Sequence, residues 1–543
     1  MKLKLFLSLL LIFIVMNLGL GSWGLTESSE ARYAEIGREM IVTGDYLNPQ
    51  LLGIQHFHKP PVTYYLAALG YKIFGLNEYG ARFFLAIALV LQLFFIYKIG
   101  ESVFRDSKRA FAGMLIYFSF PISLIATHNL TTDAFLTTFI LWAVYFWLKK
   151  KEGKSLWYHH GFYALLGVAF LTKGPVILLP TLVFIICWKL IRKEKFQFNR
   201  HHFLGMLLCL GISASWFVAV IASHPELWDY FIQDQIIKRS VDAEKFKRVE
   251  PFWYYLLLAP LVGVPWLPFI IAGGIKKRRN FFRPRSAELA LLLCIGILFL
   301  IFSLFSSKLI LYILPIFPFI AILGGSMFYA LPPKMLKIFS GIYLALVLIL
   351  AAGLIYLMLT PEFDIKLVFS VLVLVFLGIT VFLSLKFLRE NHRMKLLSLG
   401  FIFSVGLIFT YHLFAAQNPL PINSVKGVAA FIQKEKPESS RNRVIVYDYL
   451  LPSLSFYLNK EILTVHDDNF NTKREVRFEQ NDAFRENFIN LNHPGDAKRF
   501  DHIMSERNNV MVKRKKTVLP DSLQYLLKNF KRVEHIGKWE VYY

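Results

Sequence analysis

The sequence predicts a polytopic α-helical membrane protein, with about thirteen transmembrane helices and a small C-terminal extracytoplasmic α/β domain. Three observations predict it. Of the 543 residues, 55% are hydrophobic and 16% aromatic, and the mean hydropathy is +0.47, too apolar for an ordinary soluble protein. The apolar residues form runs of about 17–25, long enough to cross a bilayer. The final stretch, residues 417–543, is polar instead and mixes helix-like with strand-like patterns.

The predicted spans follow one another closely from the first residues onward. We expect them near residues 4–23, 80–104, 109–127, 132–149, 157–173, 174–191, 203–222, 254–275, 287–306, 309–329, 336–358, 365–387 and 395–416. The first run follows Lys2 and Lys4 like a signal peptide, but no persuasive small-x-small cleavage site ends it. We therefore expect a retained span. A Gly174-Pro175 turn must separate two of the shorter helices.

The net charge of +24 predicts membrane orientation. Lysine and arginine concentrate in six short loops, at residues 105–109, 149–154, 189–200, 276–285, 334–337 and 386–395. These are the alternate loops that would be cytoplasmic if the N-terminus were inside, as the positive-inside rule requires. An odd number of spans then places the C-terminus outside. The same clustering argues against nucleic acid as a partner. Attraction to anionic membrane lipid is the second role that we expect for the charge.

Three polar regions are expected outside the membrane: residues 24–79, 223–253 and the C-terminal domain. That domain should contain helices in "VKGVAAFIQKE", "PSLSFYLN" and "SLQYLLKNF", and strands in "RVIVYDY", "EILTVH", "RVEHI" and "WEVYY". We assign residues 1–416 to the transmembrane domain and 417–543 to the extracytoplasmic one. The three cysteines lie inside apolar runs, so we expect no disulfide framework.

The stretch "LTESSEARYAEIGREM" carries more charge than a short loop beside a membrane needs. A helix starting near Ser28 or Ser29 would show an apolar face made by Tyr33, Ile36 and Met40 and lie along the membrane interface. Glu30 would stand in its first turn, where the helix dipole favours a carboxylate. Arg32 and Glu35 are spaced to pair. The plain alternative is a solvated helix that only connects two spans.

More charged and polar groups gather on the predicted outer side. They are His56, His58, Lys59, Asp133, Lys173, Asp234, Lys238, Arg239, Lys308 and Tyr312. Charges at a membrane boundary are expensive and usually face a cavity or a partner. Taken singly, each has a structural explanation as a helix cap, a snorkelling side chain or an interfacial anchor. Taken together, they favour a site at one face of the membrane.

Such a cluster suits transfer of a sugar from a polyprenyl phosphate. Cations hold the lipid phosphate and stabilise it as a leaving group. A carboxylate takes the proton of the acceptor or steadies positive charge on the sugar. The sequence contains no nucleotide-binding loop, so the energy would come from the activated lipid.

Eight stretches, in order and spacing, resemble one branch of a known superfamily: "SEARYAEIGREM", "GDYLNPQLLGIQHFHKPPVTYY", "FGLNEYGARF", "LTTDAFL", "LTKGP", "EPFWYYLLLAPLVGVPW", "SKLILYILPIFP" and "PSLSFYL". This is the aminoarabinose (lipid A) transferase branch of the polyprenyl-phosphate-dependent integral-membrane glycosyltransferases, relatives of the protein O-mannosyltransferases. The resemblance covers most of the chain. It implies a multispanning glycosyltransferase fold with interfacial helices in the first outside loop, and a bacterial inner-membrane protein with its C-terminal domain in the periplasm.

The resemblance also implies residue roles. Arg32, Lys59, Arg239 and Tyr312 match groups that hold the lipid phosphate. Asp133 matches an acidic position tied to catalysis, and Lys173 matches a lysine of the same cavity. With Glu30, these are the candidate site residues; Glu30 or Asp133 would activate the acceptor.

Three positions depart from the pattern of this branch. Ser29 replaces an aspartate, which leaves Glu30 or Glu27 as the acid; His58 replaces a glutamate; and Gln235 stands near an expected histidine. The last two supply a metal site in some relatives, so both that site and the aminoarabinose assignment are open. His56 and His58 form a weak alternative metal pair, because the sequence indicates no third ligand. No cofactor is therefore assigned, and a divalent metal stays open.

The sequence thus predicts transfer of a sugar from undecaprenyl phosphate to a periplasmic acceptor, with 4-amino-4-deoxy-L-arabinose and lipid A as the specific case. Another glycolipid, a polysaccharide or a protein remains open as the acceptor. The rival interpretations are a transporter or flippase of a lipid-linked sugar and a non-enzymatic envelope scaffold. A transporter would place its charges near the bilayer midplane, often in two repeated halves, which this sequence does not show.

Overall fold

The computed structural model describes residues 2–27, 29–151, 155–232, 250–281, 283, 285–435, 443–468, 470–505 and 509–543. The chain divides into two compact units. We call the first the transmembrane unit; it comprises Met1–Leu20, Pro60–Val62 and Phe83–Phe414. We call the second the sheet unit; it comprises Gly21–Lys59, Thr63–Arg82 and Ala415–Tyr543. Most of the predicted first outside loop therefore folds together with the C-terminal residues.

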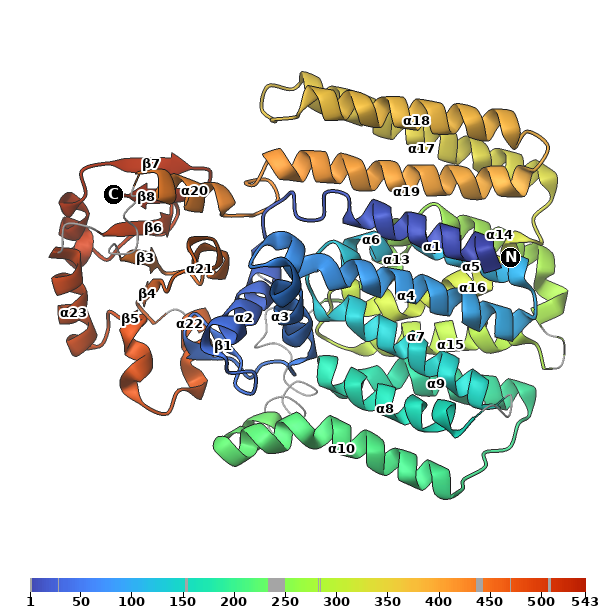
Figure 1. The fold of residues 1–543 in the computed structure, drawn as a ribbon, viewed down its shortest axis with the longest axis horizontal. Helices are drawn as coiled ribbons and strands as arrows, with labels where there is room; N and C mark the ends of the chain where they lie inside the picture. The colour runs from blue at the N-terminus through green and yellow to red at the C-terminus, as the bar shows by residue number, and fades with distance from the viewer. Residues whose placement is uncertain are drawn as a thin grey trace. The chain divides into compact units, whose positions relative to one another are not determined.

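The transmembrane unit is helical throughout the part of the chain that the structure describes (Figure 1). Its elements are α1 (Lys2–Asn17), α4 (Glu78–Phe104, shared with the sheet unit up to Arg82), α5 (Ser107–Phe118), α6 (Pro121–Thr127), α7 (Thr132–Lys151), α8 (Leu156–Lys173), η1 (Pro175–Ile177), α9 (Leu178–Arg192), α10 (Arg200–Ser223), α11 (Leu227–Asp229), α13 (Tyr254–Gly263), α14 (Trp266–Phe281), α15 (Ala287–Leu304), η4 (Ile310–Ile316), α16 (Phe317–Phe328), α17 (Pro333–Leu359), α18 (Leu367–Phe387) and α19 (His392–Gln417). Polar side chains start several of these helices. Asp106 accepts hydrogen bonds from the backbone N–H groups of Lys108 and Arg109, which satisfies donors that the first turn leaves free.

The number of spans is lower by a strict criterion than the sequence predicts. Among the described residues, eight helices are long and apolar enough to cross a membrane, or ten if each of two bent pairs counts as one span. The bent pairs are α5 with α6, at 63°, and α13 with α14, at 97°. The protein is a multispanning helical membrane protein, but the count of thirteen is not confirmed. The expected break at Gly174 and Pro175 is present, between α8 and η1.

The sheet unit contains a six-stranded sheet in the order β5-β4-β3-β6-β8-β7. Its strands are β3 (Val444–Tyr447), β4 (Leu463–His466), β5 (Phe488–Asn490), β6 (Val510–Arg514), β7 (Val533–Ile536) and β8 (Trp539–Tyr542). The first four pair in parallel, and β8 and β7 add an antiparallel edge. The other elements of the unit are α20 (Lys426–Glu435), α21 (Pro452–Leu458), α22 (Phe470–Glu475), η5 (Val476–Phe478), η6 (Asp482–Glu486), α23 (Pro494–Ser505) and η7 (Asp521–Asn529).

Both faces of this sheet are covered, so its central strands are apolar on both sides. In β3, Val444 and Val446 point into one core with α20 and α21, whereas Ile445 and Tyr447 point into a second core with α23 and η7. Figure 1 shows α23 on one side of the sheet and α21 on the other. This alternation is the period of two that a strand imposes on its side chains.

The sequence predicts four of the six strands of this sheet, β3, β4, β7 and β8. The expected helices and strands are found, with "SLQYLLKNF" as a 3-10 helix, η7. The sequence patterns did not predict β5, α23 or β6. Strand β6 lies between β3 and β8, so the missing prediction concerned a central strand.

The first outside loop supplies α2 (Ser29–Thr43), β1 (Gln50–Leu51), β2 (Ile54–Gln55) and α3 (Val62–Phe74). Ile36 and Met40 of α2 are buried in the same core as β3 and β6. Four of its five charged residues, Glu30, Glu35, Arg38 and Glu39, are buried as well, which contradicts the alternative of a solvated connecting helix. This helix packs as an internal element of the sheet unit.

Candidate functional site

The charged residues of α2 lie in a network of buried ion pairs. The carboxylate of Glu30 accepts hydrogen bonds from Arg82, at 2.8 Å from Nε and 3.0 Å from Nη2, and both side chains are fully buried. Glu30 also accepts from the backbone N–H of Thr26 at 2.9 Å and from its hydroxyl at 3.0 Å. The guanidinium donates further to the carbonyls of Trp23 and Gly24. Glu30 is thus engaged on both oxygens, which is the geometry of a structural group.

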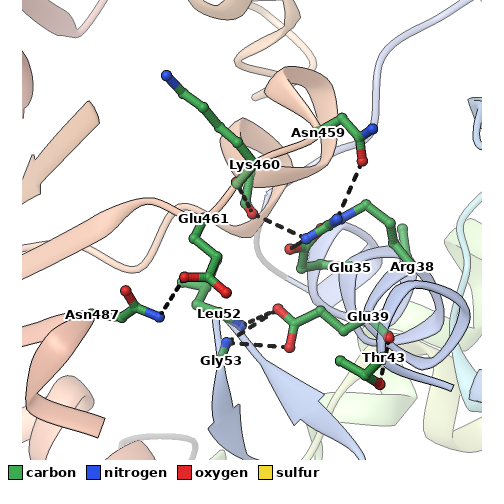
Figure 2. A network of polar contacts seen from close by, with 12 residues as sticks. Glu35, Arg38, Glu39, Thr43, Leu52, Gly53, Asn459, Lys460, Glu461 and Asn487 are labelled. Carbon is green, nitrogen blue, oxygen red and sulfur yellow. Dashed lines mark hydrogen bonds and ion pairs between the residues drawn. The ribbon is translucent and has the colours of Figure 1, made fainter. Parts of the chain in front are cut away.

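A second network lies further along α2 (Figure 2). Arg38 donates to both oxygens of Glu35, at 2.8 and 2.7 Å, and to Asn459 at 3.3 Å. Glu39 accepts from the backbone N–H groups of Leu52, at 2.5 Å, and of Gly53. Burial, reinforced by the charge of Glu35, raises the pKa of Glu39 well above its usual range.

The Glu39 contact holds the turn between β1 and β2. Both turn residues have positive φ, 58° at Leu52 and 78° at Gly53, as a two-residue hairpin turn requires. Glycine adopts this conformation freely, whereas leucine pays about 1–2 kcal/mol. The buried carboxylate offsets part of that cost by accepting the N–H of Leu52.

Glu27 precedes α2 and is a further buried acid of the sheet unit. Its Oε1 accepts hydrogen bonds from the backbone N–H of Ser453, at 3.1 Å, and from the Ser453 hydroxyl. Its Oε2 is buried without a hydrogen-bond partner among the described residues. Burial raises the pKa of Glu27 to about 7, although Ser453 and the charge of Arg32 act to lower it.

Arg32 does not pair with Glu35 as expected. Its guanidinium lies 3.5 Å from Oε1 of Glu475, and the other oxygen of Glu475 lies 3.1 Å from Nδ1 of His56 and 3.3 Å from Nε2 of His58. Burial lowers the pKa of His58 to about 3 and also lowers that of His56, so both imidazoles are neutral. Burial alone would raise the pKa of Glu475, but its contacts with the histidines and Arg32 hold it well below its usual range.

The two remaining phosphate-binding candidates from the outside loops have separate outcomes. Lys59 follows the histidine pair and is half-buried. Arg239 lies outside the described residues, as do Asp234, Gln235 and Lys238. Their predicted roles stay predictions.

The transmembrane unit brings three candidate residues together from three elements. Asp133 stands in the first turn of α7, Lys173 is the last residue of α8, and Tyr312 lies in η4. Nζ of Lys173 is 2.5 Å from Oδ1 of Asp133 and 4.3 Å from the centre of the Tyr312 ring. Only 11% of the Lys173 side chain and 8% of the Asp133 side chain are exposed. The ammonium therefore lies between a carboxylate and an aromatic face, which is a favourable place for a cation.

Buried hydrogen bonds fix the elements that carry this triad. Gln92 of α4 donates to the carbonyl of Ala134 at 2.8 Å and accepts from the hydroxyl of Tyr117 at 2.7 Å. Tyr255 of α13 donates to the carbonyl of Leu309, next to η4, at 3.0 Å. These bonds hold the start of α7 and the start of η4, so the Asp133 carboxylate and the Tyr312 ring have defined positions. A preorganised carboxylate of this kind can accept a proton or stabilise a developing positive charge.

Two residues of these networks were not singled out from the sequence. Arg82 lies within the quoted stretch "FGLNEYGARF", whose match to the family was the available signal, and Glu475 lies in a polar stretch with no motif. Each becomes significant only through a partner distant in the sequence.

Comparison with known proteins agrees with the resemblance in the sequence. Residues 58–218 match the family model described as dolichyl-phosphate-mannose-protein mannosyltransferase. An undecaprenyl phosphate-alpha-4-amino-4-deoxy-L-arabinose arabinosyl transferase of Proteus mirabilis is 33% identical over 308 residues, covering 55% of this chain and 54% of the relative. One from Aeromonas hydrophila is 34% identical over 300 residues, covering 54% of each. The predicted resemblance is confirmed.

The same comparisons show how much of each relative is matched. The chain spans about half the length of the curated relatives that it matches. The crystal structures of ArnT from Cupriavidus metallidurans, in the apo state and bound to undecaprenyl phosphate, match with a TM-score of 0.76 each, at 21% and 22% identity. Both matches cover 100% of this chain and 97% of the other. This likeness shows the fold: a multispanning membrane bundle with a C-terminal sheet region.

Proposed function

We propose that this protein transfers a sugar from undecaprenyl phosphate to an acceptor on the periplasmic side of the membrane. The specific form of the proposal is transfer of 4-amino-4-deoxy-L-arabinose to lipid A. The Lys173 ammonium held between Asp133 and Tyr312 carries the proposal, because it is a preformed polar group within a helical membrane unit. The names of the curated relatives support the donor, and the ordered motifs, which resemble the lipid A transferase branch, support the lipid acceptor.

Asp133 is the better of the two candidate acids. Glu30 is already saturated by Arg82 and Thr26, whereas Asp133 has Lys173 on one oxygen. In the proposed reaction an acceptor oxygen forms a bond to the anomeric carbon, and the bond from that carbon to the phosphate oxygen breaks. Asp133 takes the acceptor proton or steadies the positive charge on the sugar, and undecaprenyl phosphate leaves with the bond electrons.

Cations stabilise the phosphate of the departing lipid. Arg32, Lys59 and Arg239 are proposed for this role on the strength of the sequence resemblance, with Tyr312 donating a hydrogen bond. Arg32 would then have to leave or share its present partner, Glu475. Lys59 is the second described cation to test.

The proposal includes a topology. Three helices, α1, α7 and α8, occupy predicted spans beyond the strict set, and with them the total is thirteen. The protein would lie in the bacterial inner membrane with residues 1–416 as its transmembrane domain. Its N-terminus would be cytoplasmic, and residues 417–543 would be periplasmic. Lipid A is the proposed acceptor; another glycolipid, a polysaccharide or a protein would keep the chemistry and change the product.

Mass spectrometry of lipid A and envelope glycans tests this proposal directly. Cells that lack the protein should lose one added sugar mass, and wild-type protein should restore it. Asp133→Asn, Lys173→Met and Lys59→Ala should each lower transfer about 10²–10⁴-fold. Asp106→Asn is the matched control, because Asp106 caps α5 and asparagine caps equally well.

The outcomes separate the alternatives. Loss of a sugar from another glycan would keep the transfer reaction and replace lipid A as acceptor. An unchanged set of envelope glycans would reject the transferase and favour the transporter. Full transfer by Asp133→Asn would reject the assigned acid.

A further inference from the structure

We propose that His56, His58 and Glu475 form a divalent-metal site, suited to Zn²⁺, inside the sheet unit. The ligand atoms would be Nδ1 of His56, Nε2 of His58 and Oε2 of Glu475. Neither the curated relatives' names nor the sequence pattern assigns a metal to this set. The sequence alone left the histidine pair without a third ligand, and Glu475 provides it.

The three atoms have the spacing that a metal needs. They all lie within 4.8 Å of one another, with Oε2 of Glu475 at 3.1 Å from His56 and 3.3 Å from His58. Ligands placed about 2.0–2.1 Å from a tetrahedral Zn²⁺ are separated from each other by about 3.3–3.4 Å. The two Glu475 separations are close to this value, and the two histidine nitrogens, which lie within 4.8 Å of each other, would draw together to it around the metal.

The side chains are buried and held by the fold. At most 8% of any of the three is exposed. The backbone N–H of His56 donates to the carbonyl of Pro49 at 2.7 Å, and that of Gln55 donates to Glu479 at 2.6 Å. Between the histidines, Phe57 packs edge-on against Phe478. These contacts join the β1–β2 hairpin to the α22–η5 segment, so the ligands are positioned before a metal arrives.

The hydrogen bonding of the cluster is incomplete without another group. Nδ1 of His56 and Oε2 of Glu475 are buried, and neither makes a hydrogen bond of acceptable geometry to the described residues. Buried polar atoms rarely remain in that state. A cation between them would satisfy both, since each presents a lone pair.

The outer contacts orient the carboxylate. Arg32 and Arg474 approach Oε1 of Glu475, at 3.5 and 3.8 Å, which leaves Oε2 facing the histidines. Such second-layer contacts commonly change metal affinity 10–100-fold. They also add positive charge near the site, which opposes a cation, and the carboxylate of Glu475 is the ligand that offsets it.

The ligand set selects the class of metal. Two imidazole nitrogens and one carboxylate oxygen suit Zn²⁺ and related transition metals, whereas Ca²⁺ and Mg²⁺ prefer oxygen ligands. Three protein ligands also leave a fourth position for water or another ligand. The site joins the first outside loop to the C-terminal residues of the same unit, and we expect it to stabilise that unit. This inference goes beyond the proposed transfer reaction and does not depend on it.

Metal analysis of the full-length protein in detergent tests the site. The protein is purified through a tag without histidine, stripped with a chelator, incubated with Zn²⁺ and desalted. Elemental analysis should find one zinc per chain. Co²⁺ in place of zinc should give the visible spectrum of a four-coordinate site. These two measurements use the wild-type protein, so they hold even if a variant misfolds.

Variants locate the metal. Glu475→Gln and His56→Gln should each lower zinc affinity at least tenfold, whereas Glu479→Gln, which changes a carboxylate on the same hairpin contact, should retain one zinc. Zinc at a hundred times its Kd should raise the melting temperature of the stripped wild type by about 5–10 °C and leave that of Glu475→Gln unchanged. A wild type without stoichiometric zinc, or equal binding by Glu475→Gln, would overturn the proposal.

Discussion

The buried pair of Glu30 and Arg82 separates a structural role from a catalytic one. The perturbation is Glu30→Gln, which removes the negative charge and leaves the shape almost unchanged. In the folded protein Arg82 is fully buried, with its guanidinium 4.2 Å from the centre of the Trp23 ring. After the substitution its charge would keep the carbonyls of Trp23 and Gly24 but lose its counter-ion.

The expected cost follows from that burial. Removing one partner of a buried ion pair destabilises a protein by about 3–5 kcal/mol, because an uncompensated charge stays in the interior. For a unit of this size, 1 kcal/mol corresponds to about 2–4 °C in melting temperature. Glu30→Gln should therefore melt about 6–20 °C lower. The control is Glu435→Gln, an exposed glutamate at the end of α20, which should change stability by less than about 0.5 kcal/mol.

A double-mutant cycle decides between the two roles. Replacing Arg82 as well, with Arg82→Gln, removes the unpaired charge and should recover at least about 2 kcal/mol of the loss. The assays are thermal unfolding of the purified protein in detergent and sugar transfer in cells. If Glu30 is structural, the double variant regains transfer together with stability. A Glu30→Gln protein that melts like the wild type but transfers no sugar would refute this reasoning.

Two further predictions concern the sheet unit. Burial raises the pKa of Glu27 to about 7 from the ordinary 4.5. Between these two pH values the folded protein keeps a proton on Glu27 that the unfolded chain loses. The free energy of unfolding should therefore fall by about 3 kcal/mol as pH rises from 4.5 to 7. Glu27→Gln, still able to accept from Ser453, should not show this loss, so its melting temperature relative to wild type should rise with pH; a constant difference would contradict the shift. A Cβ at Gly70 would lie 2.0 Å from the carbonyl oxygen of Gly80, so Gly70→Ala should destabilise by about 1–3 kcal/mol. The matched Gly341→Ala, in open space on α17, should be neutral or slightly stabilising, and equal melting temperatures for the two variants would show that the α3–α4 approach is not tight.

The buried networks show where sequence reasoning stops. The spacing of Arg32 and Glu35 predicts a pair along one helix, yet Arg32 contacts Glu475 and Glu35 pairs with Arg38. A pair of Arg32 with Glu35 and a pair of Glu35 with Arg38 both satisfy the local rule for charges three residues apart. The choice depends on which side chains the sheet places beside α2, and that information is absent from the stretch itself.

The same limit explains the metal site and the missed strand. His56 and His58 are adjacent in sequence and are readily noticed as a pair, but Glu475 lies far away in the chain. Strand β6 has an apolar start, Val510–Val512, followed by lysine and arginine, a pattern too short to separate from a loop. Its place between β3 and β8 makes it central.

The sequence by itself determined the multispanning helical class, the polar C-terminal region and the chemical family that the chain resembles. Hydropathy and ordered motifs are local properties, and each span is decided by its own twenty residues because lipid leaves the backbone no other partner. Only the tertiary structure decided that Glu30 belongs to Arg82, that Lys173 lies between Asp133 and Tyr312, and that Glu475 completes the histidine pair. These pairings depend on burial, because a buried charge destabilises the fold strongly unless an oppositely charged group lies beside it, and that group is often distant in the sequence.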